Sequence, residues 1–293
     1  MTIDQLYPLF LQSSQVCTDT RKITDNCLFF ALKGDNFDGN EYAMEALEKG
    51  AKYAVVDNGA HASHPRALLV EDSLRALQEL ATYHRQQCNA KIVALTGSNG
   101  KTTTKELIHA VLAKKYRTIA TKGNLNNHIG VPLTLLTIQQ DTEMAVVEMG
   151  ANHKREIAFL CSIAQPDYGY ITNFGKAHLE GFGSEEGVIE GKSELYDHLI
   201  AHKKSLFLNA DDPIQQSRLG TYIHKYGFSQ ENHQYYIIKP RKGSAYVSLE
   251  AEGSLINTQL IGQYNFTNCC AAVLIGKYFN VALGAIKEAL EGY

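Results

Sequence analysis

The sequence lacks the features that mark membrane, secreted and nucleic-acid-binding proteins. No stretch of its 293 residues approaches the ~20 apolar residues that a transmembrane helix needs. Residues 1–15 contain no basic segment followed by a long apolar run, so we expect no signal peptide. The formal net charge is only −3, which gives no reason to expect nucleic acid as a partner. These absences predict a cytoplasmic protein without membrane insertion, and a monomer is the simplest assembly.

The cysteines do not form a metal-binding or disulfide pattern. None of the six lies in a C-x-x-C pair, and Cys269 and Cys270 are adjacent within an apolar helical pattern. Free thiols in a reducing compartment explain this usage best. The chain also lacks internal repeats and low-complexity tracts, and its composition of 44% hydrophobic and 20% charged residues is typical of globular proteins.

The order of sequence patterns predicts an α/β protein with two domains, 1–88 and 89–293. The first part alternates short apolar runs with helical patterns, which is typical of a small α/β domain. In the second part, strands that are apolar on both faces alternate with helices, which predicts a parallel sheet covered on both sides. Residues 222–262 alternate apolar and polar residues and are expected to add an antiparallel section. Helices are expected over 101–115, 131–138, 153–163, 185–201, 265–279 and 282–292.

A glycine-rich turn follows the apolar strand "KIVALT" and precedes a helix. Its spacing, Gly97-x-x-Gly100-Lys101-Thr102, is shorter than the common phosphate loop with four residues between its glycines. Backbone N–H groups at such a helix start favour a phosphate, Lys101 would reach its oxygens, and the Thr102 hydroxyl would bind Mg²⁺. A plain strand-to-helix turn is the alternative, but the run Gly-Lys-Thr-Thr-Thr favours nucleotide binding.

Two further strands end in residues that suit a nucleotide site. Glu148 ends "AVVE" and could hold Mg²⁺ or its water shell, because the carboxyl ends of parallel strands face the ligand crevice. His178 follows the next strand in a glycine-rich loop, where spacing alone leaves a structural and a ligand role equally open. Lys192 lies in a helical pattern, and on pattern alone it would be a solvated lysine.

These segments together resemble the Mur ligases, the ATP-dependent amide-forming enzymes of peptidoglycan synthesis. "TGSNGKTTT" is similar to their shortened phosphate loop, and "ITNFGKAHLEGFGS" to their histidine-containing loop. "EGKSELYD" resembles the segment that carries their carbamylated lysine, and "GQYNFTNCCAAVLIG" resembles their H-N-x-x-N-x-x-A-A helix. The resemblance implies a small N-terminal UDP-binding domain and a central ATPase-like domain with a phosphate loop.

The resemblance implies roles for particular residues. The ATP phosphates would lie against Gly97, Ser98, Asn99, Gly100, Lys101, Thr102 and Thr103, and the adenosine near Asn265 and Asn268. Catalysis would use Lys101, Glu148, His178 and Lys192, and Mg²⁺ would be served by Thr102, Glu148, His178 and a carbamylated Lys192. The uridine diphosphate would lie near Thr18, Asp19, Thr20, Arg21, Lys33, Gly34, Asp38 and Gly39. The region between ATP and the peptide carboxylate would be lined by Asn124, Asn126 and Asn127.

Two segments resemble one branch of the family more than the others, and a third resembles a domain that two branches share. "KGNLNNHIGVPLTLL" and "VVEMGANHKREIAFLCSIAQPDYGYITN" are similar to the ligases that join D-alanyl-D-alanine to UDP-N-acetylmuramoyl-tripeptide. "TDTRKITDNCLFFALKGDNFDGNEYAMEALEKGA" resembles the UDP-binding domain that they share with the ligases for the third stem residue. The resemblance therefore implies ATP, Mg²⁺, this UDP-linked tripeptide and D-alanyl-D-alanine as ligands, with an acyl phosphate intermediate.

The sequence departs from the family pattern in three places. Tyr264 stands where relatives often have His, and Lys154 with Arg155 stands where they often have a smaller pair. The chain also stops where a third, C-terminal domain is expected, which implies a fragment that is inactive alone. The open alternatives are a ligase for the third stem residue, a folylpolyglutamate synthetase, a phosphate-loop ATPase or kinase, and a nucleotide-sugar-binding module without turnover.

Overall fold

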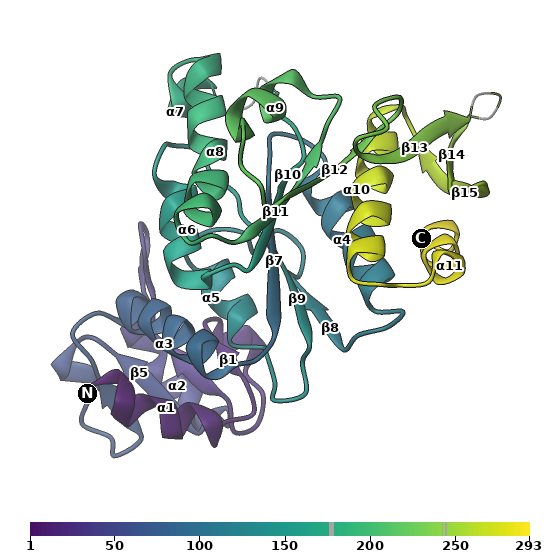
Figure 1. Ribbon diagram of the computed structural model, residues 1–293. Helices are drawn as coiled ribbons and strands as arrows, with labels where there is room; N and C mark the ends of the chain where they lie inside the picture. Colours follow the sequence, from purple (N-terminus) through teal and green to yellow (C-terminus); the bar gives the residue numbers. More distant parts are fainter. Residues whose placement is uncertain (176–178, 242, 244) are drawn as a thin grey trace. The chain divides into compact units, whose positions relative to one another are not determined.

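The computed structural model describes residues 1–175, 179–241, 243 and 245–293. It contains two compact units, and Figure 1 shows their elements coloured along the chain. One unit comprises Met1–Cys88 and His128–Ile138, and the other comprises Asn89–Asn127 and Gln139–Tyr293. The first break lies between Cys88 and Asn89, and the short segment 128–138 belongs by its contacts to the N-terminal unit.

The N-terminal unit is built on a parallel sheet with the strand order β1-β2-β5-β6. These strands are β1 (Val16–Cys17), β2 (Leu28–Phe30), β5 (Tyr53–Val56) and β6 (Ala67–Leu69). A separate hairpin pairs β3 (Lys33–Gly34) with β4 (Phe37–Asp38). The helices are α1 (Ile3–Leu11), α2 (Ala43–Glu48), α3 (Ser73–Gln87) and α5 (Gly130–Leu135), with 3₁₀ turns η1 (Thr20–Lys22), η2 (Gly39–Tyr42) and η3 (Gly59–His61). The α/β character expected for this part is confirmed.

Helix α3 explains why 128–138 joins this unit. Asp72 caps the helix by accepting from the Arg75 N–H at 2.7 Å. Its buried residues recur at helical spacing and include His84, whose Nε2 contacts the Ile138 carbonyl at 2.8 Å. Gln78 donates to the His128 carbonyl at 3.0 Å, so both ends of the segment are held by α3.

The second unit contains a nine-stranded sheet with the order β15-β14-β13-β12-β11-β10-β7-β9-β8. The strands are β7 (Lys91–Thr96), β8 (Thr118–Ala120), β9 (Met144–Glu148), β10 (Tyr168–Ile171), β11 (Ser205–Asn209), β12 (Lys225–Ser229), β13 (Tyr236–Arg241), β14 (Tyr246–Ala251) and β15 (Ser254–Ile261). The pairings from β8 through β13 are parallel. Within the described part of this sheet, β13–β14 and β14–β15 are antiparallel, which confirms an appended antiparallel section. Strand β12 pairs in parallel with β11 and β13, so the expectation that this section begins at residue 222 was wrong. Alternating polarity shows a half-exposed strand but not the direction of its neighbour.

Helices cover both faces of this sheet. Figure 1 shows α6 (Glu156–Ala164) and α8 (Glu185–Ala201) on one side, and α4 (Lys101–Leu112), α10 (Tyr264–Tyr278) and α11 (Leu283–Glu291) on the other. Two short helices, α7 (Leu179–Phe182) and α9 (Pro213–Leu219), complete the unit. This arrangement confirms the parallel sheet covered on both faces that the sequence predicts.

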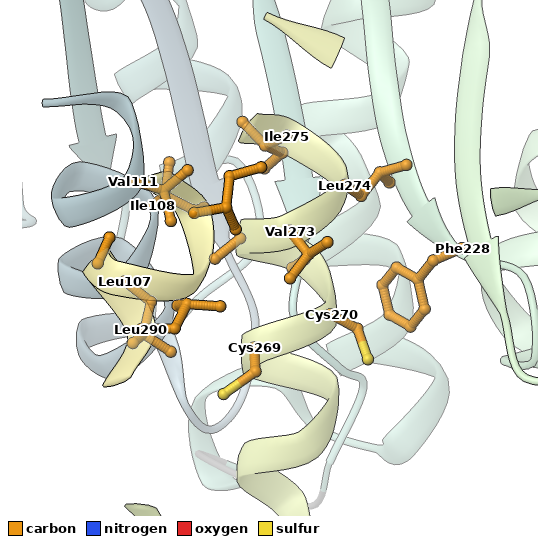
Figure 2. Close-up of a cluster of buried hydrophobic side chains, with 14 of the residues drawn as sticks. Leu107, Ile108, Val111, Phe228, Cys269, Cys270, Val273, Leu274, Ile275 and Leu290 are labelled. Carbon is orange, nitrogen blue, oxygen red and sulfur yellow. The ribbon is translucent and has the colours of Figure 1, made fainter. Parts of the chain in front are cut away.

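The packing of α10 against α4 and the sheet forms the main core of the second unit. Figure 2 shows Cys270 and Phe228 of β12 among the side chains of this core, and Leu290 of α11 beside Leu107 of α4. A Cβ on Gly276 would lie 2.4 Å from Val111 Cγ1, so the glycine lets α10 approach α4 closely. Burying each large apolar side chain contributes roughly 1.5–3 kcal/mol, which makes this contact a firm support for the residues at the start of α10.

Candidate functional site

The loop from Gly97 to Gly100 joins β7 to α4 with a backbone that requires glycine. Gly97 has φ +143° and Gly100 has φ +76°, both in the region that favours glycine. A Cβ on Gly97 would lie 2.0 Å from Thr172 Oγ1, and a Cβ on Gly100 would lie 2.8 Å from Asn268 Oδ1. The two glycines therefore permit both the turn and the close approach of neighbouring elements.

The end of the neighbouring strand β10 holds this loop in place. The Ser98 N–H donates to the Asn173 carbonyl at 3.1 Å, and the Asn99 N–H donates to Asn173 Oδ1 at 3.1 Å. Thr172 Oγ1 donates to the Asn99 carbonyl at 2.7 Å. Thr172 and Asn173 were not predicted from the sequence, although their place at the end of an adjacent parallel strand was the available signal.

Lys101 is the first residue of α4, and its side chain folds back over the loop. Its Nζ donates to the Gly97 carbonyl at 2.8 Å and to the Ser98 carbonyl at 3.2 Å. Burial lowers the pKa of Lys101, while the nearby Glu148 carboxylate opposes that shift. The next residues, exposed Thr102 and half-buried Thr103, lie in the first turn, whose N–H groups have no acceptor within the helix. A cation and a helix start thus meet at one loop, an arrangement that suits a phosphate.

Glu148 ends β9 as a buried carboxylate with one oxygen in use. Its side chain is buried in the core, and Oε1 accepts from Asn126 Nδ2 at 2.7 Å. Its N–H donates to Thr121 Oγ1 at 3.0 Å, which fixes the backbone at the strand end. Oε2 is buried without a hydrogen-bond partner among the described residues. Burying a carboxylate oxygen without a partner costs free energy unless a cation or a water binds it. Glu148 Oε2 is therefore suited to bind Mg²⁺ or its water shell.

The segment 121–127, here called the asparagine loop, follows β8 in the chain and contacts the end of β9. The Asn126 N–H donates to the Asn124 carbonyl at 2.7 Å, and the Asn126 carbonyl accepts from the Gly150 N–H at 2.8 Å. A Cβ on Gly150 would lie 2.7 Å from Asn126 Oδ1, so glycine is needed for this approach. Asn126 is therefore brought to Glu148, and Asn124 and Asn127 are exposed on the same loop.

Lys192 lies on α8 and is buried, which contradicts the solvated lysine expected from pattern alone. Its Nζ donates to the Ala151 carbonyl at 2.9 Å and lies 5.0 Å from the Phe182 ring centroid. Burial, followed by the positive charge of Lys101, lowers the pKa of Lys192 to about 8. Both partners come from other segments of the chain, so the helical pattern of α8 could not reveal them.

The two asparagines of α10 also reach this site. Asn268 Nδ2 donates to Asn265 Oδ1 at 2.8 Å, and Asn265 Nδ2 donates to the Ile261 carbonyl at 2.9 Å. Both are buried, and the Asn268 carboxamide lies beside Gly100 of the loop. Tyr264, the departure noted above, is 71% exposed and points no polar group at the loop in any described contact.

The basic pair Lys154–Arg155 connects the segment after Glu148 to α8 through an ion pair and a hydrogen bond. Lys154 Nζ pairs with Glu190 at 2.5 Å, and the Arg155 N–H donates to Glu194 Oε1 at 2.5 Å. Arg155 has φ +73°, a conformation that is strained for a side chain other than glycine. These contacts keep Ala151 next to Lys192.

The predicted histidine could not be compared with the structure, because His178 lies outside the described residues. Within residues 1–175, 179–241, 243 and 245–293, no group of three or more His, Cys, Asp or Glu could hold a metal by itself. The metal site predicted here would therefore draw on Glu148, the Thr102 hydroxyl and the phosphates of a nucleotide, as is usual for Mg²⁺.

The N-terminal unit carries the residues predicted to bind uridine diphosphate in two places. Asp19 accepts from the Arg21 N–H, Nε and Nη2 at 3.0, 2.9 and 2.8 Å, and these bonds lower the pKa of Asp19 to about 2. This turn fixes η1, with Thr18 and Thr20 on either side of Asp19.

The second place is the β3–β4 hairpin, with Lys33, Gly34, Asp38 and Gly39. Asn40, fully buried, donates from Nδ2 to Asp38 Oδ1 at 2.6 Å and to Asp57 Oδ1 at 2.8 Å. Asp57 also pairs with Lys33 Nζ at 2.8 Å. The support that Asn40 and Asp57 give to this hairpin was not predicted from the sequence, because no local pattern links residues that are 17 positions apart.

The pKa of Lys192 gives a testable pH dependence. Its pKa falls from an ordinary 10.5 to about 8 on folding, so between these pH values the unfolded chain binds more protons and stability rises with pH. Below pH 8 the buried Lys192 is charged, and its burial lowers the free energy of unfolding by the full amount, about 3 kcal/mol at most. In CO₂-free buffer with a chelator, Lys192→Met is expected to be more stable than wild type at pH 7, with the difference shrinking toward pH 10. Urea unfolding at each pH measures this, and a pH-independent difference would contradict it.

No helix of the described residues is long and apolar enough to cross a membrane. All six cysteines are free thiols, as their spacing predicted.

Comparisons with known proteins show which family the chain resembles. The Mur ligase middle domain matches residues 95–276, and the Mur ligase family catalytic domain matches residues 13–86. The chain is similar to UDP-N-acetylmuramoyl-tripeptide–D-alanyl-D-alanine ligases from Bacillus subtilis (36% identical, 94% of this chain and 61% of the relative) and Escherichia coli (38%, 94% and 62%). It thus spans about three fifths of the length of these relatives.

Solved structures give the same result. The chain resembles a crystal structure of MurF from Acinetobacter baumannii with a TM-score of 0.83 at 30% identity, over 99% of this chain and 67% of that one. It also resembles the MurF ligase from Thermotoga maritima in complex with ADP, with a TM-score of 0.79 at 29% identity, over 95% and 66%. Because the model of the family's middle domain matches more than half of the chain, this chain belongs to the Mur ligase family.

Proposed function

We propose that this chain forms the nucleotide- and precursor-binding part of a ligase that joins D-alanyl-D-alanine to UDP-N-acetylmuramoyl-tripeptide, using ATP. The observation that carries the proposal is the meeting of Lys101, Glu148 and Asn268 around the Gly97–Gly100 loop. The names of the relatives support the choice of substrates. A ligase of this kind needs a phosphate loop because a carboxylate resists attack by an amine until a leaving group is attached.

The proposed reaction has two steps. A carboxylate oxygen of the tripeptide attacks the γ-phosphorus of ATP, the bond to the bridging oxygen breaks, and ADP leaves. The amine of D-alanyl-D-alanine then attacks the acyl phosphate carbon, loses a proton, and expels inorganic phosphate from the tetrahedral intermediate. Lys101 would offset negative charge on the transferring phosphoryl group, and positioning and electrostatics supply most of the catalysis in such sites.

Two groups would complete the charge balance of the site. When bound, Mg²⁺ would offset the charge of phosphate oxygens, with Glu148 Oε2 and the Thr102 hydroxyl as the ligands that this chain offers. We also propose that His178 serves this metal region. Lys192, whose pKa near 8 leaves much of the amine neutral in mildly alkaline solution, would add CO₂ and release a proton. The resulting carbamate anion would act as a further metal ligand, and its remaining N–H could still donate to the Ala151 carbonyl, which accepts from Lys192 Nζ in the unmodified chain.

The other predicted residues take their roles from the same proposal. Asn265 and Asn268 would contact the adenosine, and Asn124, Asn126 and Asn127 would face the peptide carboxylate. In the N-terminal unit, the Thr18–Arg21 turn and the β3–β4 hairpin would hold the uridine diphosphate. A monomeric state, the absence of nucleic acid as a partner and a cytoplasmic location remain predictions from the sequence alone.

Phosphate release with different amines tests the proposed function. The full-length protein that carries this sequence is given ATP, Mg²⁺ and UDP-N-acetylmuramoyl-tripeptide, and then D-alanyl-D-alanine, diaminopimelate, lysine or glutamate. We expect release only with D-alanyl-D-alanine. Release with another amine would move the substrate within the family, release without any amine would favour an ATPase or kinase, and ligand binding without release would favour a binding module.

A further inference from the structure

Lys105 is a buried cation that the chemistry proposed above does not use. It lies one turn after Lys101 on α4, and its side chain is 0% exposed. Its Nζ pairs with Glu106 Oε1 at 2.9 Å and donates to the Gly123 carbonyl at 3.3 Å. Burying an ammonium costs free energy that an apolar side chain of similar length would avoid. The position of this cation therefore calls for an explanation other than filling the core.

The contact with Gly123 reaches the asparagine loop between its two attachments to β9. At one end Thr121 accepts from the Glu148 N–H, and at the other Asn126 donates to Glu148 Oε1. Gly123 lies between these points with φ +54°, and it is exposed. The buried ammonium thus links the phosphate-loop helix to the middle of the loop that holds Glu148.

We infer that Lys105 is a positioning residue that fixes the asparagine loop to α4, so that Asn126 holds Glu148 with Oε2 turned to the metal region. Lys101 and Lys105 lie on the same face of α4, one turn apart. Lys101 serves the phosphate loop, and Lys105 sets the position of the carboxylate relative to that loop. The part of this inference that concerns Mg²⁺ rests on the proposed function, whereas the part that concerns the loop does not.

Hydrogen–deuterium exchange of the ligand-free chain tests the loop directly. In Lys105→Met, amides of residues 122–127 are expected to exchange at least tenfold faster, with residues 97–112 unchanged. Glu106→Gln is the matched control, because it removes the ion pair but leaves the Gly123 contact, and it should leave exchange in the loop unchanged. Unchanged exchange at 122–127 in Lys105→Met, or faster exchange spread over the whole second unit, would overturn the inference.

Gly123→Ala provides a second variant that leaves the buried lysine in place. A Cβ there meets nothing within 4 Å, so the change strains only the local backbone at positive φ. It should speed exchange at 122–127 as Lys105→Met does, even if that first variant folds poorly. Exchange at the wild-type rate in Gly123→Ala would count against the loop being held at this point.

Nucleotide affinity then tests the link to Glu148. Lys105→Met should leave the Kd for ADP without Mg²⁺ within twofold and weaken binding of ADP with Mg²⁺ at least fivefold. In an Asn126→Ala background, Lys105→Met should cause little further loss, because both act through the same carboxylate. Additive losses would overturn the inference. If the wild-type chain bound no ADP, the proposed function would fail, while the exchange result would still decide the role of Lys105 in the loop.

Discussion

Lys101→Ala is expected to lower ATP-dependent phosphate release by about 10²–10³-fold, the loss typical of removing one charge-stabilising donor. The Lys101 ammonium donates to the carbonyls of Gly97 and Ser98, next to the place where the loop would hold a phosphate. ADP affinity should fall about tenfold or more, since a hydrogen bond to a charged group contributes roughly 1.5–3 kcal/mol. Isothermal titration with ADP and a phosphate-release assay measure the two effects.

The stability of this variant separates a chemical loss from a folding loss. Burial lowers the pKa of Lys101, so the charge of this side chain adds little to the stability of the folded chain. Lys101→Ala should therefore change the free energy of unfolding by about 1 kcal/mol or less. Lys114→Ala is the matched control, because Lys114 follows the same helix and pairs on the surface with Glu288 at 3.0 Å. Normal ADP binding by Lys101→Ala, or an equal loss in Lys114→Ala, would contradict the phosphate-loop assignment.

Glu148→Gln is expected to lower turnover by a similar factor of about 10²–10³ and to raise the Mg²⁺ concentration needed for half-maximal rate. Glutamine keeps the shape and can still accept from Asn126 Nδ2 through Oε1. It replaces the unpartnered Oε2 by an uncharged amide and so removes the ligand that Mg²⁺ would use. A titration of the rate with Mg²⁺ and thermal unfolding of the metal-free chain are the two measurements.

Glu143→Gln provides the comparison for this variant at the opposite end of β9. Glu143 is exposed and accepts from the Arg117 N–H at 2.9 Å, away from the phosphate loop. It should leave the Mg²⁺ dependence unchanged. Glu148→Gln should also fold about as stably as wild type, because removing a half-paired buried charge relieves a desolvation cost. An unaltered Mg²⁺ dependence in Glu148→Gln would remove Glu148 from the metal site.

Features coded by neighbouring residues were predicted well from sequence. Helix α8 was expected over 185–201 and occupies Glu185–Ala201, because Ser184 caps it by accepting from the Gly187 N–H at 3.0 Å. The phosphate loop was equally readable, since its strand, glycines and helix start are contiguous. The position of Glu148 at the end of a buried strand was also readable from a local pattern, whereas its role in binding a ligand stays a prediction.

Features set by distant partners were not predicted from residue patterns. The parallel pairing of β12 and β13 depends on which strands become neighbours, and alternation does not encode that. The burial of Lys192 arises from Ala151 and Phe182, and only the family resemblance pointed to its role. Thr172 and Asn173 hold the phosphate loop from more than 70 residues away, as the separations of 73 and 74 positions show. Such contacts are properties of the fold rather than of any local segment.

The fate of an oxygen atom tests the central claim most directly, namely that this phosphate loop serves to activate a carboxylate. The full-length protein that carries this sequence is given UDP-N-acetylmuramoyl-tripeptide labelled with ¹⁸O in its reacting carboxylate, together with ATP, Mg²⁺ and D-alanyl-D-alanine. That carboxylate attacks the γ-phosphorus, and the amine then displaces phosphate from the acyl carbon. These two steps move one carboxylate oxygen into each phosphate released. The account predicts one ¹⁸O per phosphate by mass spectrometry, whereas unlabelled phosphate would show transfer to water and contradict it.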